Sequence, residues 1–217
     1  MYMEIVLENL VPIPLKEKFS KRTSGIWNTK VAFKPGEKIQ IQAPSGTGKT
    51  TLIHLIYKLR HDYEGRVFYD AKPLTEIKDH ELAETRQKKI SIIFQDLRLF
   101  ENLTARENIE LKRVLITPLY EASVIDSMAN RLGISHILHQ KAGVCSYGEQ
   151  QRIAIIRALM QPFHWLIMDE PFSHLDHENI EKAVGLIDEE CDKRQAGLLI
   201  TDLEEDHHFT YTKRYQL

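Results

Sequence analysis

A glycine-rich loop between a predicted strand and a predicted helix constrains this chain more than any other feature. The loop reads APSGTGKT (43–50). It follows the alternating segment EKIQIQ (37–42) and leads into TTLIHLIYKLR (50–60), whose apolar residues recur at helical spacing. Glycines in such a loop let backbone N–H groups surround an anion, and the following helix points its positive N-terminal end at the same place. The arrangement predicts an α/β fold that binds phosphate groups.

The residues of this loop match the pattern G-x-x-x-x-G-K-[ST], with alanine at the first glycine position. Lys49 is expected to reach the β- and γ-phosphates of a nucleotide, and Thr50 to bind Mg²⁺. Ala43 is the smallest replacement for glycine but disfavours a positive φ. The alternative is a glycine-containing turn with a chance lysine, which the strand–loop–helix context disfavours. The predicted ATP-binding residues are Ala43, Pro44, Ser45, Gly46, Thr47, Gly48, Lys49, Thr50 and Thr51.

A second informative segment is WLIMDE (165–170), in which an apolar strand ends in two acidic residues. At the carboxyl end of a parallel strand beside the phosphate loop, two carboxylates would meet a bound nucleotide. Asp169 is placed to hold Mg²⁺, and Glu170 to orient and deprotonate an attacking water. Taken alone, this segment is equally compatible with an ordinary buried strand leaving the core.

Strand-like and helical segments alternate along the chain, which favours a mostly parallel sheet covered on both faces. Between about residues 96 and 158 the pattern is helical, so a helical lobe inserted between strands is expected. The segments predicted as strands are 4–9, 37–42, 65–69, 90–94, 165–168 and 197–201, and a helix is predicted near 177–190.

Composition narrows the class of protein. The chain has 217 residues, 42% of them hydrophobic, which suits one domain with a sizeable core. A formal net charge of −2 gives no general attraction to nucleic acid, and no nucleic-acid partner is expected. Cys145 and Cys191 have no paired spacing, which argues against a disulfide framework or a zinc site. No apolar stretch approaches the ~20 residues that cross a bilayer, and the N-terminus does not resemble a signal peptide.

Three further segments identify a family resemblance. CSYGEQQR (145–152) resembles the L-S-G-G-[QE]-Q-Q-R signature of ATP-binding cassette (ABC) proteins. IIFQDLRLF (92–100) resembles the glutamine loop of that family, with Gln95 as its glutamine, and FSHLD (172–176) resembles its aspartate loop, ending at Asp176. The motifs stand in the family's order and cover essentially the whole chain. The short length and the glutamine loop look most like the lipoprotein-release, cell-division and macrolide-export group.

The resemblance implies an architecture. It is an α/β P-loop NTPase fold with a mostly parallel central sheet, an antiparallel β region near the N-terminus and an inserted helical lobe. Residues 1–217 would form a single nucleotide-binding domain. Its core lobe would comprise 1–95 and 159–217, and its helical lobe about 96–158.

The resemblance also implies an activity, that of the ATP-binding and ATP-hydrolysing subunit of a transporter. Two copies would pair as a homodimer around two ATP molecules and drive a separate transmembrane permease from the cytoplasmic side of the membrane. The permease would dock near residues 96–106. The implied residues are Glu170, Gln95 and Lys49 for catalysis, Thr50, Gln95 and Asp169 for Mg²⁺, and Ser146, Tyr147, Gly148 and Glu149 for contact with the partner's ATP.

Two departures from the family pattern concern the γ-phosphate. Tyr147 replaces the first glycine of the signature. Ser146 and Gly148, the residues expected to contact phosphate, are retained, so we expect a site that is modified but not lost. Asp202 stands where the family has a switch histidine. A carboxylate cannot donate a hydrogen bond unless it is protonated, and it would repel a phosphate. His207 and His208 follow, and their expected role is that of solvated tail residues.

A third departure concerns the adenine, which the family stacks on an aromatic ring upstream of the phosphate loop. The expected position, near VPIPL (11–15), has no aromatic residue. Phe19 is the candidate, whereas Trp27 is expected to pack in a sheet.

Other aromatic and histidine residues have structural interpretations. Phe209, Tyr211 and Tyr215 fall at even spacing and are predicted to share one face of a last strand and to pack in the core. His54 and His61 are predicted to face solvent.

Three alternatives remain open at this point. The chain could be a nucleotide-gated dimerisation module with weak hydrolysis, which Asp202, Tyr147 and Ala43 favour. It could be an AAA-type motor, against which the SYGEQQR segment argues. It could be a DNA-repair or translation ATPase of the same superfamily, although such proteins carry long coiled coils or two cassettes.

Overall fold

The structure is a computed structural model that describes residues 2–19, 24–205 and 207–217, without the side chains of Lys18 and Phe19. The suggested adenine contact of Phe19 therefore lies outside the described residues.

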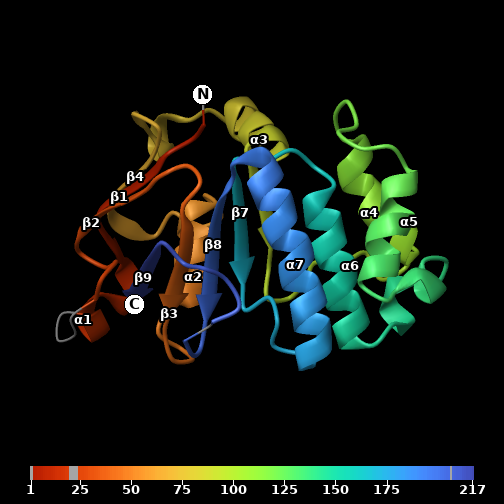
Figure 1. Ribbon diagram of the computed structural model, residues 1–217. Helices are drawn as coiled ribbons and strands as arrows, with labels where there is room; N and C mark the ends of the chain where they lie inside the picture. The colour runs from red at the N-terminus through yellow and green to blue at the C-terminus, as the bar shows by residue number, and fades with distance from the viewer. Residues whose placement is uncertain (1, 20–23, 206) are drawn as a thin grey trace.

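A five-stranded parallel sheet forms the centre of the molecule (Figure 1). Its strand order is β6-β7-β8-β3-β9, and each neighbouring pair is parallel. Because the strands are parallel, the loops that follow β3, β6, β7 and β8 all leave from one edge of the sheet. The strands are β3 (Lys38–Gln42), β6 (Ile90–Ile93), β7 (Trp165–Asp169), β8 (Gly197–Asp202) and β9 (Lys213–Gln216).

A second, antiparallel sheet lies on the N-terminal side, with strand order β2-β1-β4-β5. In the register of this sheet, Ile5 pairs with both Phe33 and Tyr69. The expected P-loop NTPase fold, with a parallel central sheet and an antiparallel N-terminal region, is confirmed. The antiparallel strands are β1 (Ile5–Pro12), β2 (Lys30–Phe33), β4 (Tyr63–Tyr69) and β5 (Lys72–Pro73).

Alternation along the parallel strands creates two hydrophobic cores. On β7, Leu166 and Met168 join the core shared with α6 and α7, while Trp165 and Ile167 join the core shared with α2 and the antiparallel sheet. Both faces are covered, which explains why these strands read as unbroken apolar runs. The helices are α1 (Lys16–Phe19), α2 (Lys49–Ile56), α3 (Asp79–Lys88), α4 (Ala105–Val114), α5 (Ser123–Arg131), α6 (Tyr147–Leu159) and α7 (His177–Arg194), with 3₁₀ turns at Ile13–Leu15, Leu74–Glu76, Ser135–Ile137 and Ala142–Val144.

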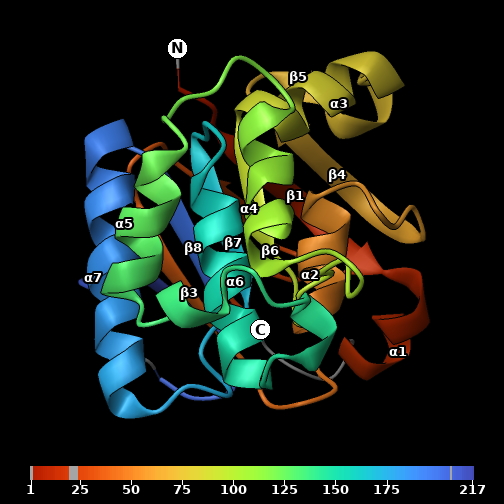
Figure 2. The same cartoon turned by 90° about the vertical axis from the view of Figure 1, so that its right-hand side faces the viewer.

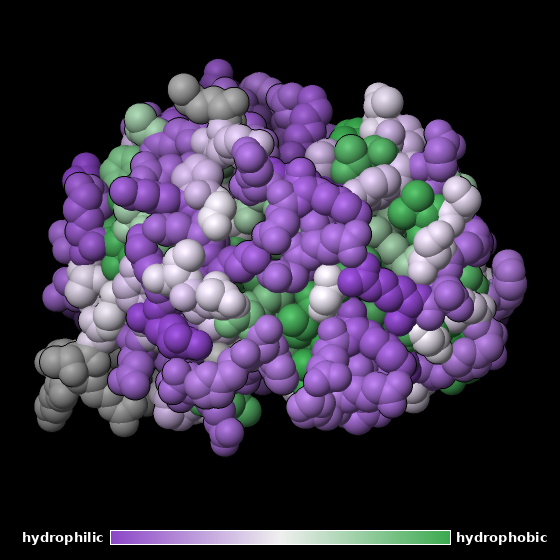
Figure 3. Space-filling model, in the orientation of Figure 1, coloured by the Kyte–Doolittle hydropathy of each residue, from purple (hydrophilic) through white to green (hydrophobic). Residues whose placement is uncertain are grey.

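The segment between β6 and β7 carries α4, α5 and α6. In Figure 2, α4 and α5 lie nearest the viewer, with α6 and then the parallel sheet behind them. One hydrophobic cluster runs from α4 and α5 through α6 to β7 and β8. The face in Figure 3 is mostly hydrophilic, with hydrophobic surface gathered near the α4–α5 connection, where Val114, Leu115 and Leu119 are exposed. Among the described residues, no helix has both the length and the apolar character needed to cross a membrane.

Three sequence-based interpretations are corrected. Trp27 does not lie in a sheet: it is buried in the turn before β2. Phe209 and Tyr211 precede β9 and share no strand face with Tyr215, because Phe209 stacks on Phe172 in one core and Tyr215 contacts Phe33 in the other. His54 is half-buried against Phe94, with ring centroids 5.9 Å apart, and burial lowers the pKa of its imidazole.

A buried carboxylate fastens the α4–α5 connection to α7. Glu190 is 2% exposed. Its Oε2 accepts hydrogen bonds from the Tyr120 hydroxyl at 2.6 Å and from the Arg194 guanidinium at 2.5 Å. Arg194 also donates to the Leu159 carbonyl at the end of α6. Burial disfavours ionisation of Glu190, but the Tyr120 hydrogen bond and the Arg194 charge outweigh it and lower the pKa of its carboxyl group.

We predict that Glu190→Gln lowers the free energy of unfolding by about 3 kcal/mol, because the half-buried Arg194 guanidinium loses its charged partner. Its neighbour Glu189 makes exposed ion pairs with Arg131 and Lys193, so Glu189→Gln is the matched control and should have a smaller effect. Since the pKa of Glu190 is lowered in the folded protein, its contribution is present above its unfolded pKa and is lost as pH falls through the folded value. Urea unfolding at neutral and acidic pH checks both points. Equal effects of the two substitutions would contradict this assignment.

Candidate functional site

The glycine-rich loop closes the gap between β3 and α2. Ala43 continues the pairing of β3, with its N–H donating to the Asp202 carbonyl at 3.0 Å, and it is not among the residues with positive φ. Alanine therefore fits the first position of the pattern. Gly48, at the N-terminus of α2, has φ 101°, a conformation that L side chains rarely adopt. The buried face of α2, formed by Leu52, Ile53, Leu55 and Ile56, fixes this helix against the core.

Lys49 is the charged centre of the site. It is only 5% exposed, and its ammonium group donates to the Ala43 carbonyl at 2.7 Å and to the Pro44 carbonyl at 3.3 Å. The same group forms an ion pair with Glu170 Oε1 at 3.1 Å. A buried ammonium needs such acceptors, because desolvation strongly disfavours an unpaired charge. The loop is thus held around a positive charge.

Glu170 joins the phosphate loop to the glutamine loop. Its backbone has φ 48°, which is unusual for a residue with a side chain and marks stored strain. Its Oε2 accepts from Gln95 Nε2 at 3.2 Å, and Gln95 Oε1 accepts from the Thr50 hydroxyl at 3.4 Å. The structure therefore brings Lys49, Thr50, Gln95 and Glu170 together.

These four residues border a cavity of about 230 Å³. Leu15 also borders it, and sequence reasoning passed over this residue. Leu15 belongs to VPIPL (11–15), the segment where the family resemblance places an aromatic ring and this chain has none. The other lining residues are Ser45, Gly46, Gly48 and Thr51.

The donors expected to hold Mg²⁺ fit a hard cation, which prefers oxygen ligands. Asp169 is 1% exposed, and its Oδ1 accepts from the Thr201 hydroxyl at 2.6 Å. Its buried Oδ2 has no hydrogen-bond partner among the described residues. An orphaned, buried carboxylate oxygen at the end of β7, directly before Glu170, is the feature expected of a cation site. Among the described residues, no group of three or more His, Cys, Asp or Glu side chains is arranged so that it could hold a metal ion.

The signature segment forms the N-terminus of α6. Ser146 caps the helix: its hydroxyl accepts from the Glu149 N–H at 3.4 Å, and the Glu149 carboxylate accepts from the Ser146 hydroxyl and N–H, each at 2.8 Å. The hydroxyl and then the backbone hydrogen bond from Ser146 lower the pKa of Glu149. None of Ser146, Tyr147, Gly148 and Glu149 borders the Lys49 cavity of its own chain.

Asp176, in the aspartate loop after β7, and Asp202, at the switch position that ends β8, both lie at the carboxyl edge of the parallel sheet, but their side chains have different surroundings. Asp176 caps α7 by accepting from the Asn179 N–H at 2.9 Å, and this hydrogen bond lowers the pKa of its carboxyl group. Asp202 ends β8, and its Oδ1 accepts from the Leu203 N–H at 2.6 Å. The Asp202 side chain borders a separate cavity of about 220 Å³, together with His208, rather than the Lys49 cavity. His207 is exposed and borders neither cavity.

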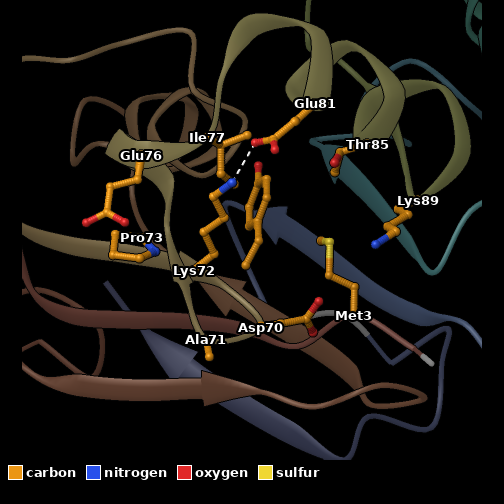
Figure 4. A pocket seen from close by; sticks show the side chains of 11 residues that line it. Met3, Asp70, Ala71, Lys72, Pro73, Glu76, Ile77, Glu81, Thr85 and Lys89 are labelled. Atoms are coloured by element: carbon orange, nitrogen blue, oxygen red, sulfur yellow. Dashed lines mark hydrogen bonds and ion pairs between the residues drawn. The ribbon is translucent and has the colours of Figure 1, made fainter.

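A larger cavity than the Lys49 cavity lies elsewhere. It has a volume of about 510 Å³ and lies between the β4–β5 hairpin, α3 and Met3 (Figure 4). Lys72 and Glu81 form an ion pair across it at 2.6 Å. None of the residues expected to bind nucleotide borders it, so size does not identify the functional site.

Comparison with known proteins is consistent with this geometry. Residues 26–173 match the family model described as ABC transporter. The chain is 33% identical to the uncharacterized ABC transporter ATP-binding protein YvcR of Bacillus subtilis (strain 168), over 76% of this chain and 64% of that protein. It is also 33% identical to the lipoprotein-releasing system ATP-binding protein LolD of Psychrobacter arcticus (strain DSM 17307 / VKM B-2377 / 273-4), over 76% of this chain and 74% of that protein. The match thus spans just under two thirds of YvcR.

Solved structures agree with the sequence comparisons. The chain superposes on the bacterial ABC transporter cassette MJ0796, solved as a dimer, with a TM-score of 0.74 and 28% identity, covering 91% of this chain and 87% of that one. A dimer of MJ0796 bound to ADP and Pi, in a post-hydrolysis state, gives a TM-score of 0.75 and 26% identity, covering 92% and 88%. With the motif residues gathered at one edge of a P-loop NTPase sheet, the chain belongs to the ABC transporter family.

Proposed function

We propose that this chain binds and hydrolyses Mg-ATP as a homodimer and so drives a separate transmembrane permease. The observation that carries the proposal is the contact of Lys49, Glu170, Gln95 and Thr50 around one cavity at the carboxyl edge of the sheet. A lysine and backbone N–H groups bind phosphate, and a carboxylate beside them can accept a proton from water.

The geometry supports a mechanism in which the γ-phosphate of ATP replaces the Glu170 carboxylate as the partner of the Lys49 ammonium group. Lys49 and Glu170 are paired at 3.1 Å. A bound γ-phosphate takes over the Lys49 ammonium, and Glu170 is released to accept a proton from the attacking water. The water oxygen bonds to the γ-phosphorus as the bond to the β-phosphate oxygen breaks, giving ADP and phosphate. Gln95, hydrogen-bonded to Glu170, orients the water, and Mg²⁺ held by Thr50, Gln95 and Asp169 neutralises phosphate charge when bound.

The proposed dimer uses the signature of one chain against the nucleotide of the other. Ser146 and the Gly148 N–H stand at the N-terminus of α6, a position suited to an anion. Because they do not border the cavity of their own chain, a partner's γ-phosphate is the fitting ligand. The dimers of MJ0796 support this assembly.

The proposed membrane partner follows from the family and from the surface of the glutamine loop. Phe100 is 59% exposed in this loop, so its ring is accessible to a partner's surface. The relative LolD is named as the ATP-binding protein of a lipoprotein-releasing system, which supports a role for this chain as one component of a larger system. We place this chain on the cytoplasmic face of the membrane, held there by the permease.

A second candidate function is a nucleotide-gated dimerisation module with slow hydrolysis. Asp202 favours it, since this side chain borders a different cavity together with Glu204 and Glu205 and supplies no donor toward the Lys49 cavity. The two candidates differ in the rate of hydrolysis.

We predict that Lys49→Ala weakens Mg-ATP binding about ten- to a hundredfold, because a charge-assisted phosphate contact is lost. Lys58→Ala is a suitable control, since Lys58 also donates to a backbone carbonyl, that of Ile77 at 2.7 Å, but lies outside the site. Titration calorimetry on folded samples measures both. Undiminished affinity in Lys49→Ala would remove the basis of the phosphate-loop assignment.

We predict that Glu170→Gln stabilises an ATP-bound dimer, because the amide keeps the shape of the carboxylate but cannot accept the proton. Size-exclusion chromatography with light scattering should show dimer in ATP, and phosphate release should fall about a hundredfold or more. Glu178→Gln, at an exposed carboxylate on α7, serves as the control and should behave like the parent. Hydrolysis at the parental rate in Glu170→Gln would show that Glu170 is not the base.

We predict that Asp202→His raises kcat up to about a hundredfold by supplying a hydrogen-bond donor to the γ-phosphate. Asp202→Asn should raise it less, and His207→Ala should leave it unchanged. Single-turnover hydrolysis at saturating Mg-ATP distinguishes these variants. If both Asp202 variants are slower than the parent, Asp202 takes part in hydrolysis as it stands.

A further inference from the structure

Tyr147 is the first residue of α6, where the backbone is held in place by the helix cap. The Ser146–Glu149 capping contacts hold the first turn of the helix, and most of its later residues are buried. Gly148 lies so close to the aspartate loop that a Cβ built there would stand 2.9 Å from the His174 carbonyl oxygen. Two side chains of α6 reach the aspartate loop: Gln151, whose Oε1 accepts from the His174 N–H at 3.3 Å, and Tyr147 at the first position of the helix.

The Tyr147 side chain contacts two loops at once. Its hydroxyl donates to the Gln95 carbonyl at 2.8 Å. Its ring meets the edge of His174, with centroids 4.3 Å apart and planes at 65°. Gln95 follows β6 and His174 follows β7, so one side chain joins the loops after two neighbouring strands.

The backbone after Gln95 is held by a local turn and by side chains of α6. The N–H groups of Leu97 and Arg98 donate to the carbonyls of Phe94 and Asp96, at 2.9 Å and 2.6 Å. Leu97 and Arg98 have φ values of 56° and 48°. In the part of the chain that the structure describes, no backbone N–H donates to the Gln95 carbonyl. Arg157, near the other end of α6, donates to the carbonyls of Leu97 and Arg98, and burial lowers the pKa of its guanidinium to about 10. Helix α6 thus holds this turn at three carbonyls, through one side chain near each of its ends.

The Gln95 side chain carries this constraint to the reaction site, through its contacts with Glu170 and Thr50. We infer that Tyr147 is a positioning residue: it fixes the Gln95 backbone against the signature helix and so holds the Gln95 amide on Glu170. This inference rests on the proposed ATP hydrolysis. It also gives the replacement of a signature glycine by tyrosine a physical purpose.

Tyr147→Phe tests the inference, because it removes the hydrogen bond and keeps the ring against His174. Loss of one neutral hydrogen bond corresponds to a change of about three- to tenfold, so kcat should fall by that factor with the KM for Mg-ATP unchanged. Tyr2→Phe is a close control. The Tyr2 hydroxyl also donates to a glutamine, Gln195 at 3.0 Å, and its ring also meets a histidine, His164 at 5.4 Å, but far from the site.

Two further measurements separate positioning from a general structural effect. In a Gln95→Ala background, Tyr147→Phe should have no further effect on kcat, because the amide that Tyr147 positions is gone. In the nucleotide-free protein, Tyr147→Phe should speed hydrogen exchange of the amides in 94–99 about threefold or more, while Tyr2→Phe should not.

The outcomes are distinguishable. A parent protein without ATPase activity would overturn the proposed function, and hydrogen exchange would still decide whether Tyr147 holds the glutamine loop. Unchanged exchange in 94–99, or an equal loss of kcat with and without the Gln95 amide, would overturn the role of Tyr147.

Discussion

A single buried ammonium group organises the carboxyl edge of the parallel sheet. Lys49 lies almost out of solvent, and its charge must be met by acceptors within a few ångströms. The Ala43 and Pro44 carbonyls accept hydrogen bonds from Lys49 and so hold the loop against the helix that carries the lysine. Glu170 supplies the counter-charge from the end of β7, which β8 separates from β3. Since Glu170 also holds Gln95, the shape of the glutamine loop depends on the same charge. A nucleotide γ-phosphate carries more negative charge than a carboxylate and can therefore replace Glu170 at Lys49. That exchange would alter the phosphate loop, the end of β7 and the glutamine loop together.

Much of the fold could be predicted because the strands report it locally. Unbroken apolar runs such as WLIM identify strands covered on both faces, and such strands in alternation with helices require a parallel sheet. Loops after parallel strands converge at one edge. The meeting of Lys49 and Glu170 could therefore be expected from the order of the strands, and that of Gln95 with them from the resemblance to the ABC family.

What could not be predicted depends on contacts between distant segments. Even spacing suggested one strand for Phe209, Tyr211 and Tyr215, but the chain turns into β9 only at Lys213, and the packing partners Phe172 and Phe33 lie far away in sequence. The direction of the Asp202 side chain and the hydrogen bond from Tyr147 to Gln95 are likewise set by tertiary neighbours. The sequence offers no signal for Leu15, because an aliphatic side chain in VPIPL does not differ in pattern from an ordinary packing residue, yet it lines the cavity.

The position of β3 in the sheet has a consequence for how the molecule is made. β3 directly precedes the phosphate loop, yet both of its neighbours, β8 and β9, come from the last part of the chain. The antiparallel sheet, by contrast, uses strands between Ile5 and Pro73 and can pair early in synthesis. Until β8 and β9 emerge from the ribosome, both edges of β3 are unpaired and its apolar side chains are exposed. Such a strand can pair with another chain and cause misassembly. The segment that begins the nucleotide site is thus paired only after β8 and β9 have been synthesised, and a nascent chain would need protection there until then.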